Sequence, residues 1–289
     1  MKKIVFLLLF SFSVIAQPQL VGKKIYFFGD SISYGAVVQP SQCYAVLVSN
    51  ALGMVLTDHK VYSIKGTCMM SQSPSCRVDC RHMEYRADNN QIPIYNPEKD
   101  GLIFISYLTN DVGINLPNYT IENFGKAVDK VIQALFNAGW PVDRIKFNVR
   151  YYITDAGLAK YPSSLYGWFT PATMERYNAF ADLLKSKLST QGIQYFDHYD
   201  TLNAVEYPYS HLPDKVHPDP YFHSLIAKNI IDNIKIENSL SVENFEGNSD
   251  FKSVEYYNLL GQKIKEPKGI VIVRTSKNGV VYTGKRYYK

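Results

Sequence analysis

The sequence predicts an α/β fold in which a five-stranded parallel sheet lies between two layers of helices, followed by a small antiparallel β tail. Strand-like and helix-like segments alternate along the chain, which is typical of a parallel sheet covered on both faces. With 46% hydrophobic and 20% charged residues, the 289-residue chain can bury such a core. The expected strands are 23–29, 60–65, 101–107, 143–153 and 192–197, and the expected helices are 41–53, 121–138, 171–190 and 219–236.

The individual elements rest on local patterns. The first strand contains the apolar run Ile25 to Phe28, the second runs from His59 to Lys65, and the third contains Leu102 to Ile105. The helix at 121–138 repeats apolar residues at helical spacing, and Thr120 before it is a residue type that caps helix N-termini. Its apolar positions are therefore expected to face the core.

The segment Gly29-Asp30-Ser31 follows the first strand directly. A serine at this point lies at the carboxyl edge of the sheet, where ligand sites of α/β proteins gather, so Ser31 is a candidate nucleophile. The same residues also suit an ordinary turn, and Asp or Ser after a strand is a common helix N-cap. The nucleophile interpretation requires further catalytic residues elsewhere in the chain.

Such residues occur at other loops. A nucleophilic serine needs a base, and the base needs an acid that orients it. Asp214 and His217 have the spacing Asp-x-x-His just before a helix-like segment. Gly66 ends the second strand and Asn110 follows the third. Glycine leaves its backbone N–H unshielded and asparagine offers an uncharged side-chain N–H, so both can donate to an oxyanion, although each is also an ordinary turn residue.

This order of Ser, Gly, Asn and Asp-x-x-His resembles the SGNH hydrolase family, also called GDSL-type esterases, over residues 23–236. The resemblance implies a flavodoxin-like three-layer fold and a serine esterase that uses no metal or organic cofactor. The roles that it implies are nucleophile for Ser31, base for His217, orienting acid for Asp214, and oxyanion donors for the backbone of Ser31, the backbone of Gly66 and the side chain of Asn110.

One position departs from the family pattern. The family usually has glycine two residues before the asparagine, whereas this chain has Leu108, so a Cβ is present where the family has none. The substitution leaves Asn110 in place but makes the local backbone path uncertain from sequence. The chain has no Gly-x-Ser-x-Gly sequence, which argues against an α/β-hydrolase.

Two other histidines have acidic neighbours. Asp197-His198-Tyr199-Asp200 could be an acid–base pair or part of a metal site, but it follows a short strand, so we expect solvated residues of an exit loop. His211 is close to Asp214 in the sequence and is interpreted as a surface-loop residue or a substrate contact.

The cysteines of an exported chain predict disulfides. We expect two bridges that brace the loop after Gly66, without a choice among the three possible pairings. The alternative, a metal site completed by His82, lacks the paired Cys-x-x-Cys spacing of zinc sites. The cysteines concerned are Cys43, Cys68, Cys76 and Cys80.

The N-terminus has the pattern of a secretory signal peptide. Lys2 and Lys3 precede an apolar run that ends at Ala16, and this run is too short to span a bilayer. We therefore expect residues 1–16 to be a signal peptide, no integral membrane segment, and a protein that is secreted or at the cell surface.

The formal net charge of +5 is unevenly distributed. Residues 252–289 carry nine basic and two acidic side chains, whereas residues 4–250 carry 20 basic and 24 acidic ones. The main domain is therefore mildly acidic, and binding to nucleic acid is not expected.

The C-terminal part is expected to be separate. A polar stretch at 237–250 predicts a linker between a hydrolase domain at 20–236 and a β-rich domain at 251–289. The segments Asn258-Leu259-Leu260-Gly261-Gln262-Lys263 and Gly269-Ile270-Val271-Ile272-Val273 resemble the C-terminal sorting domain of type IX secretion cargo in Bacteroidetes. That resemblance implies the secretion machinery as a partner. A small polysaccharide-binding module is the alternative.

A long aromatic loop is expected between Tyr151 and Pro171. Tyr166, Trp168 and Phe169 could stack on a sugar or an apolar acyl group, or pack the loop against its own domain.

The sequence therefore predicts a secreted serine esterase. Acyl esters, acetyl esters among them, on carbohydrate are the leading substrate class, with other small esters as further candidates. A lipid esterase or lysophospholipase is an alternative of the same enzyme class. A non-catalytic glycan-binding protein on the same fold is the alternative from a different class.

Overall fold

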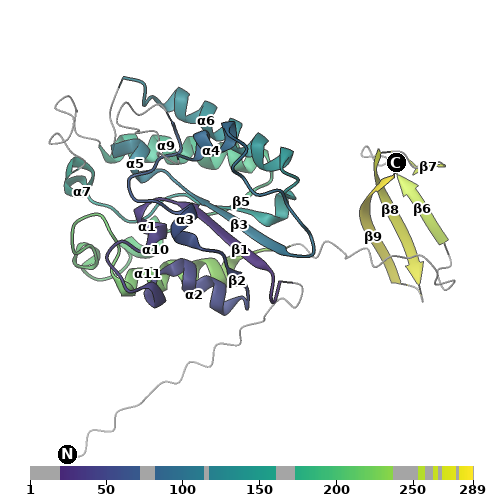
Figure 1. Ribbon diagram of the computed structural model, residues 1–289, viewed down its shortest axis with the longest axis horizontal. Helices are drawn as coiled ribbons and strands as arrows, with labels where there is room; N and C mark the ends of the chain where they lie inside the picture. Colours follow the sequence, from purple (N-terminus) through teal and green to yellow (C-terminus); the bar gives the residue numbers. More distant parts are fainter. Residues whose placement is uncertain are drawn as a thin grey trace, which may run out of the picture. The chain divides into compact units, whose positions relative to one another are not determined.

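In the computed structural model of this protein, the described residues are 20–71, 82–113, 117–160, 173–236, 253–257, 263–265, 269–277 and 280–288. The chain divides into two compact units between Lys235 and Ile236. The first unit contains a parallel sheet with helices and the second an antiparallel sheet (Figure 1). The predicted signal peptide and linker, at 1–16 and 237–250, lie outside the described residues.

The first unit is built on a five-stranded sheet with the order β2-β1-β3-β4-β5, in which every neighbouring pair is parallel. The predicted α/β fold with a five-stranded parallel sheet is therefore confirmed. In a sheet of this order, ligands bind outside the carboxyl ends of β1 and β3, where the winding direction changes. The strands are β1 (Lys24–Gly29), β2 (Val55–Leu56), β3 (Asp100–Ser106), β4 (Ile145–Asn148) and β5 (Gln194–Phe196).

The strand predicted at 60–65 is wrong. The structure has a short helix there, α3 (His59–Tyr62), and Ser63 joins the sheet through a single parallel bridge to Gly29. Asp58 caps α3 by accepting a hydrogen bond from the Lys60 N–H at 3.2 Å. This cap favours a helical turn over the strand that the side-chain pattern indicates. The edge strand is β2, which the sequence did not predict.

Two layers of helices enclose the sheet (Figure 1). One face is covered by α4 (Met83–Asp88), α6 (Ile121–Asn137) and α9 (Met174–Thr190), and the other by α2 (Tyr44–Ala51) and α11 (Pro220–Asn233). The remaining helices are short: α1 (Ser31–Tyr34), η1 (Pro40–Gln42), α5 (Thr109–Gly113), η2 (Val142–Arg144), α7 (Asp155–Lys160), α10 (Tyr199–Asn203) and η3 (Pro208–His211).

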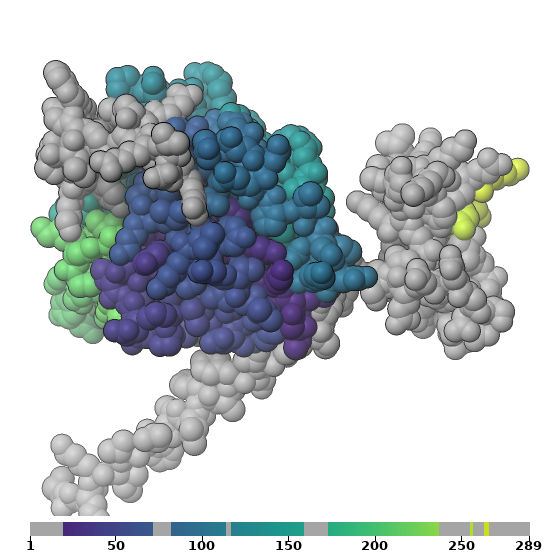
Figure 2. All heavy atoms as spheres, in the orientation of Figure 1, coloured from purple at the N-terminus to yellow at the C-terminus, as the bar shows by residue number. Residues whose placement is uncertain are grey.

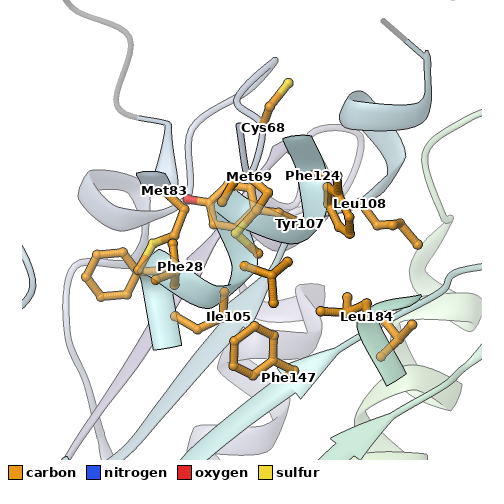
Figure 3. Close-up of a cluster of buried hydrophobic side chains, with 14 of the residues drawn as sticks. Phe28, Cys68, Met69, Met83, Ile105, Tyr107, Leu108, Phe124, Phe147 and Leu184 are labelled. Atoms are coloured by element: carbon orange, nitrogen blue, oxygen red, sulfur yellow. The ribbon is translucent and has the colours of Figure 1, made fainter. Parts of the chain in front are cut away.

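Both faces of the sheet are buried, so neighbouring residues of β1 enter different packing layers. Phe27 stacks on Phe104 of β3 with ring centroids 4.7 Å apart, and it meets Tyr44 of α2 edge to face at 5.7 Å. On the opposite face, Phe28 belongs to a large apolar cluster that reaches Phe124 of α6 (Figure 3). The cluster includes Leu108, just before α5, and Val112 within it, so it packs against that helix.

The second unit is a four-stranded antiparallel sheet with the order β7-β6-β8-β9. Its longest pairing joins β8 to β9 over nine residue pairs. This sheet confirms the predicted antiparallel β tail. Its strands are β6 (Ser253–Tyr257), β7 (Lys263–Ile264), β8 (Gly269–Lys277) and β9 (Val280–Tyr288).

Within the residues that the structure describes, no helix has the length and apolar character needed to cross a membrane.

Candidate active site

The end of β1 sets the position of Ser31. Asp30 caps α1 by accepting a hydrogen bond from the Ile32 N–H at 2.9 Å, and Ser31 is the first helical residue. A Cβ on Gly29 would lie 2.3 Å from Ser33 Oγ. Glycine is therefore required for the helix to approach the strand this closely.

Ser31, His217 and Asp214 form a continuous line of hydrogen bonds. Ser31 Oγ lies 2.8 Å from His217 Nε2, and His217 Nδ1 lies 2.6 Å from Asp214 Oδ2. An ionised carboxylate can only accept a hydrogen bond, so Nδ1 carries a proton and donates a hydrogen bond to Asp214. This tautomer leaves the Nε2 lone pair to accept the hydroxyl proton of Ser31.

Asp214 is held in its ionised form. Burial raises its pKa, but the backbone N–H and ring of His217 and the Val216 N–H outweigh burial and lower the pKa to about 2. Its Oδ1 accepts the backbone N–H groups of Val216 at 3.1 Å and His217 at 2.8 Å. One carboxylate thus fixes both the loop backbone and the imidazole ring.

Gly66 and Asn110, the two other residues that the sequence singled out, meet at the short segment that contains Gly66 and Thr67, which Asn110 contacts from α5. Asn110 donates a side-chain N–H to the Thr67 carbonyl at 2.7 Å, and the Thr67 hydroxyl lies 3.2 Å from the Gly29 carbonyl at the end of β1. Gly66 has a φ of 76°, which favours glycine. It is exposed, and its N–H has no hydrogen-bond partner among the described residues.

Asp111 is a residue of this site that sequence reasoning missed. Its carboxylate oxygens accept the backbone N–H groups of Met69 at 2.8 Å and Met70 at 2.9 Å. Consecutive side chains of α5, Asn110 and Asp111, therefore hold the segment that follows Gly66. The signal was present as a second polar residue at the exit of an apolar strand.

Leu108 does not disturb this arrangement. Its side chain is 2% exposed and belongs to the same apolar cluster as Phe124 (Figure 3). It is not among the residues with positive φ, so its backbone conformation does not require glycine. The core accepts the side chain, and Asn110 keeps its place in α5.

A group of buried hydroxyls lies under α1. The hydroxyl oxygen of Tyr44 lies 2.7 Å from Ser33 Oγ and 3.1 Å from Ser106 Oγ, within reach of its single proton, and it accepts hydrogen bonds from Tyr151 and Asn148, both at 3.2 Å. Burial raises the pKa of Tyr44 to about 12, so the phenol stays protonated. Ser106 and Asn148 end β3 and β4, so one phenol connects α1 to the ends of two strands.

His198 is fully buried, and the expectation of a solvated loop residue is wrong. Its Nε2 lies 3.1 Å from Asn148 Oδ1, and its Nδ1 lies 3.0 Å from Asn229 Nδ2. These amide partners require a proton on Nε2 and none on Nδ1, and burial lowers the pKa of the ring to about 3. His198 therefore extends the buried network to α11, while Asp197 pairs with Arg150 at 2.8 Å.

Cys43 is a free thiol, so the prediction of two bridges among the four cysteines is wrong for this residue. Its sulfur donates a hydrogen bond to the Ser33 carbonyl at 3.3 Å, and burial raises the pKa of the thiol to about 11. Of the cysteines that the structure describes, Cys43 and Cys68 are not bonded to each other. Cys76 and Cys80 lie outside the described residues.

The remaining predicted contacts have different outcomes. His211 Nδ1 lies 2.8 Å from Asp219 Oδ2, and its ring stacks on Phe222 with centroids 4.8 Å apart, so this side chain packs against the start of α11. The proposed aromatic contacts Tyr166, Trp168 and Phe169 lie outside the described residues.

The loop with Asp214 and His217 is supported by α7. Lys215 lies between them and has a φ of 76°, in the left-handed region. A Cβ on Gly157 in α7 would lie 2.3 Å from the carbonyl oxygen of Lys215. The absence of a side chain at Gly157 therefore allows the close contact that supports the strained residue.

Comparison with known proteins agrees with this geometry. A family model described as GDSL-like Lipase/Acylhydrolase matches residues 25–230. No curated protein matches the sequence significantly. A solved protein from Lactobacillus plantarum has 16% identity, with 74% of this chain and 96% of that chain covered and a TM-score of 0.53. Axe2, an acetylxylan esterase from Geobacillus stearothermophilus, has 16% identity, with coverage of 75% and 96% and a TM-score of 0.50. At these identities the structures show a shared fold.

We expect Gly157→Ala to displace the Lys215 carbonyl and with it the Asp214–His217 loop. Because small misplacements of reacting groups cost much of the rate, kcat/KM for 4-nitrophenyl acetate should fall about 10- to 100-fold. Gly125→Ala is the matched control, since its Cβ would meet the flexible ends of Lys187 and Leu183. Full activity in the Gly157 variant would show that α7 does not hold the loop.

Buried titratable groups oppose one another as the pH changes. Burial lowers the pKa of His82 and His223 to about 4 and that of His198 to about 3, so acid favours the unfolded chain, in which histidines are protonated. Burial raises the pKa of Asp30 and Asp111 to about 7, against the effect of backbone N–H donors, so acid favours the folded chain through these two groups. Three histidines against two carboxyls predict a net loss of stability as pH falls from about 6.5 towards 4.

We expect His223→Gln to weaken this acid sensitivity. Glutamine keeps an acceptor for the Tyr44 N–H, which His223 Nδ1 accepts at 3.2 Å, but it does not titrate. The variant lacks the proton that His223 takes up when the chain unfolds. The slope of the unfolding free energy against pH should therefore fall by about 1.4 kcal/mol per pH unit between about pH 4.5 and 6. Urea unfolding at several pH values measures this slope. An unchanged slope would mean that His223 is not kept neutral by folding.

Proposed function

The chain belongs to the GDSL-like lipase/acylhydrolase family and is a hydrolase of ester bonds, and on this premise we propose that Ser31 is its nucleophile, His217 its general base and Asp214 the acid that orients the base. The observation that carries the proposal is the line of hydrogen bonds from Ser31 Oγ to His217 Nε2 at 2.8 Å and from His217 Nδ1 to Asp214 at 2.6 Å. The His217 tautomer in this line, with the proton on Nδ1 and a free lone pair on Nε2, is the one that general-base catalysis requires.

The reaction has two steps. Ser31 Oγ attacks the ester carbonyl carbon while its proton passes to His217 Nε2; the alcohol oxygen then takes that proton as its bond to carbon breaks. Ser31 now carries the acyl group. In the second step His217 takes a proton from an attacking water, and this proton returns to Ser31 Oγ as the acid leaves. Asp214, ionised throughout, stabilises the imidazolium that forms in each step.

The negative charge on the carbonyl oxygen needs hydrogen-bond donors. We assign this role to the backbone N–H groups of Ser31 and Gly66 and to the side chain of Asn110. Ser31 opens α1, and the first N–H groups of a helix have no acceptor within it. Asn110 is fixed by its bond to Thr67, so its amide is preorganised. Each such donor contributes on the order of 3 kcal/mol to catalysis.

We propose acylated carbohydrate, with short acyl groups such as acetyl, as the substrate class. The similar fold of an acetylxylan esterase supports this choice. A lipid esterase or lysophospholipase is the alternative within the family. The family match and the intact line from Ser31 to Asp214 argue against the non-catalytic glycan-binding protein that the sequence left open.

We expect Ser31→Ala and His217→Ala to lower turnover of an ester substrate by about 10⁴-fold or more each. The double variant should be little worse than either single one, since the two side chains act as one unit. Thermal unfolding should first establish that the variants are folded. A folded Ser31→Ala protein with near-native turnover would refute the assignment of the nucleophile.

A hydrolysis screen tests the substrate class. We expect the wild-type protein to prefer acetylated sugars over long-chain fatty acyl esters and phospholipids, with Ser31→Ala as the blank that corrects for spontaneous hydrolysis. A preference for lysophospholipids or long acyl chains would favour the lipid esterase instead.

We further propose that residues 1–16 direct secretion and that the chain from Phe251 is an address for type IX secretion. The separate C-terminal unit supports this proposal, as does the excess of basic residues in that part. A chain truncated after Ile236 should keep the activity of the full chain but remain inside a type IX-competent host. Loss of folding or activity on truncation would instead make the C-terminal unit part of the hydrolase.

A further inference from the structure

Two tyrosines are exposed side by side in the loop between β5 and α11. Tyr207 is 60% exposed and Tyr209 is 62% exposed, and their rings meet edge to face with centroids 6.3 Å apart. Their backbone is a hydrogen-bonded turn at η3, in which the Ser210 N–H bonds to the Tyr207 carbonyl at 3.0 Å and the Leu212 N–H to the Tyr209 carbonyl at 3.2 Å. The turn fixes the main chain from which both rings project.

The backbone of Tyr207 is strained. Its φ of 53° and ψ of 56° lie in the left-handed region, where glycine and asparagine are favoured and a bulky side chain costs energy. Its carbonyl accepts both the backbone N–H and the hydroxyl of Ser210, at 3.0 and 2.8 Å, and a glycine carbonyl could accept the same bonds. The turn therefore needs only the backbone conformation of Tyr207, and its exposed ring adds nothing to the turn. We take this as an indication that the ring contacts a ligand.

The pair belongs to the loop that carries the proposed catalytic residues. The His211 carbonyl accepts the Asp219 N–H at 2.9 Å, which ties the end of η3 to a position two residues beyond His217. Figure 1 shows this loop extending past the carboxyl ends of the strands, on the side of the sheet where α1 begins. In Figure 2 the same light green part of the chain lies at the surface next to the purple N-terminal part.

The chemistry of the pair suits a carbohydrate. Tyrosine offers a rigid apolar ring with a hydroxyl at its tip, and such rings suit wet surfaces where a ligand is partly polar. Among the described residues, the large aliphatic side chains that are exposed, which a lipid would need, all lie outside the loop between β5 and α11. They are Val21, Val37, Val55, Val61, Ile94, Ile121 and Val142.

We propose that Tyr207 and Tyr209 form a sugar-binding subsite that holds a pyranose ring of an oligosaccharide next to the sugar whose ester is cleaved. This inference rests on the proposed function and deepens it, because it makes the substrate a chain of at least two sugars. The subsite strengthens the binding of longer oligosaccharides and takes no part in the cleavage of the ester bond.

Chain-length dependence tests the subsite. The kcat/KM values for O-acetylated mono- and tetrasaccharides of xylose, mannose and glucosamine, all of them esters, are measured together with 4-nitrophenyl acetate. We expect the wild-type protein to favour a tetrasaccharide over its monosaccharide, and Tyr207→Gly and Tyr209→Ala each to lower that ratio about tenfold. Tyr207→Phe should keep it. The thermal midpoint of Tyr207→Gly should not fall, because glycine adopts the left-handed conformation freely.

Ile94→Ala is the matched control, since Ile94 is 81% exposed and lies before the amino end of β3, whereas the tyrosines follow the carboxyl end of β5. The ratio of this variant should equal that of the wild type. No gain with chain length in the wild type would overturn the subsite. So would a gain that survives both tyrosine substitutions, or an equal loss on all substrates including 4-nitrophenyl acetate.

Failure of the esterase proposal would be distinguishable from failure of the subsite. If the wild type hydrolyses no ester, the proposed function falls, and calorimetric titration of Ser31→Ala protein with unacetylated tetrasaccharides still tests the tyrosines. Binding that Tyr207→Gly weakens about tenfold would support the subsite. Absence of binding to every tetrasaccharide would overturn it.

Discussion

The backbone hydrogen bonds between β1 and β3 are the constraint on which the site depends. They pair the two strands in parallel up to Gly29 and Ser106, so both strands end at the same level. The segments that follow therefore start side by side, which places Ser31 on α1 near Asn110 on α5. The strand order changes direction between β1 and β3, so the connection after β1 and the connection after β3 run towards opposite sides. The space between the two strand ends is therefore left for a ligand.

His217 comes to this point from much farther away, and several local features act together to hold it. β3 and β4 separate β5 from β1, so the loop after β5 has to return across two strands to bring His217 to Ser31. Asp214 binds both the ring and the backbone of His217, and Gly157 leaves room for the left-handed Lys215 between them. Since the supporting bonds come from different elements, the geometry of the proposed catalytic residues depends on the whole unit being folded.

The sequence predicted the parts of this structure that are coded locally. The motif around Ser31 and the spacing of Asp214 and His217 are short sequence patterns that can be recognised without knowledge of the fold. The apolar runs in the sequence predicted the positions of β1 and β3. The strand expected at 60–65 failed because a single capping residue, Asp58, starts a helix that the side-chain pattern does not show. His198 was misjudged because its burial depends on Asn148, a partner 50 residues away that no local pattern reveals.

The buried carboxyls of Asp30 and Asp111, which follow β1 and β3, show why a site of this kind cannot be optimal for stability alone. Both oxygens of Asp111 accept backbone N–H groups, which favours the ionised form, whereas complete burial favours the neutral form and raises its pKa to about 7. Ionising Asp111 near neutral pH therefore costs folding free energy, and Asp30, equally buried, adds repulsion. The same ionisation strengthens the bonds from α5 to the segment after Gly66. The placement of the proposed oxyanion donors and a lower stability thus have one physical origin.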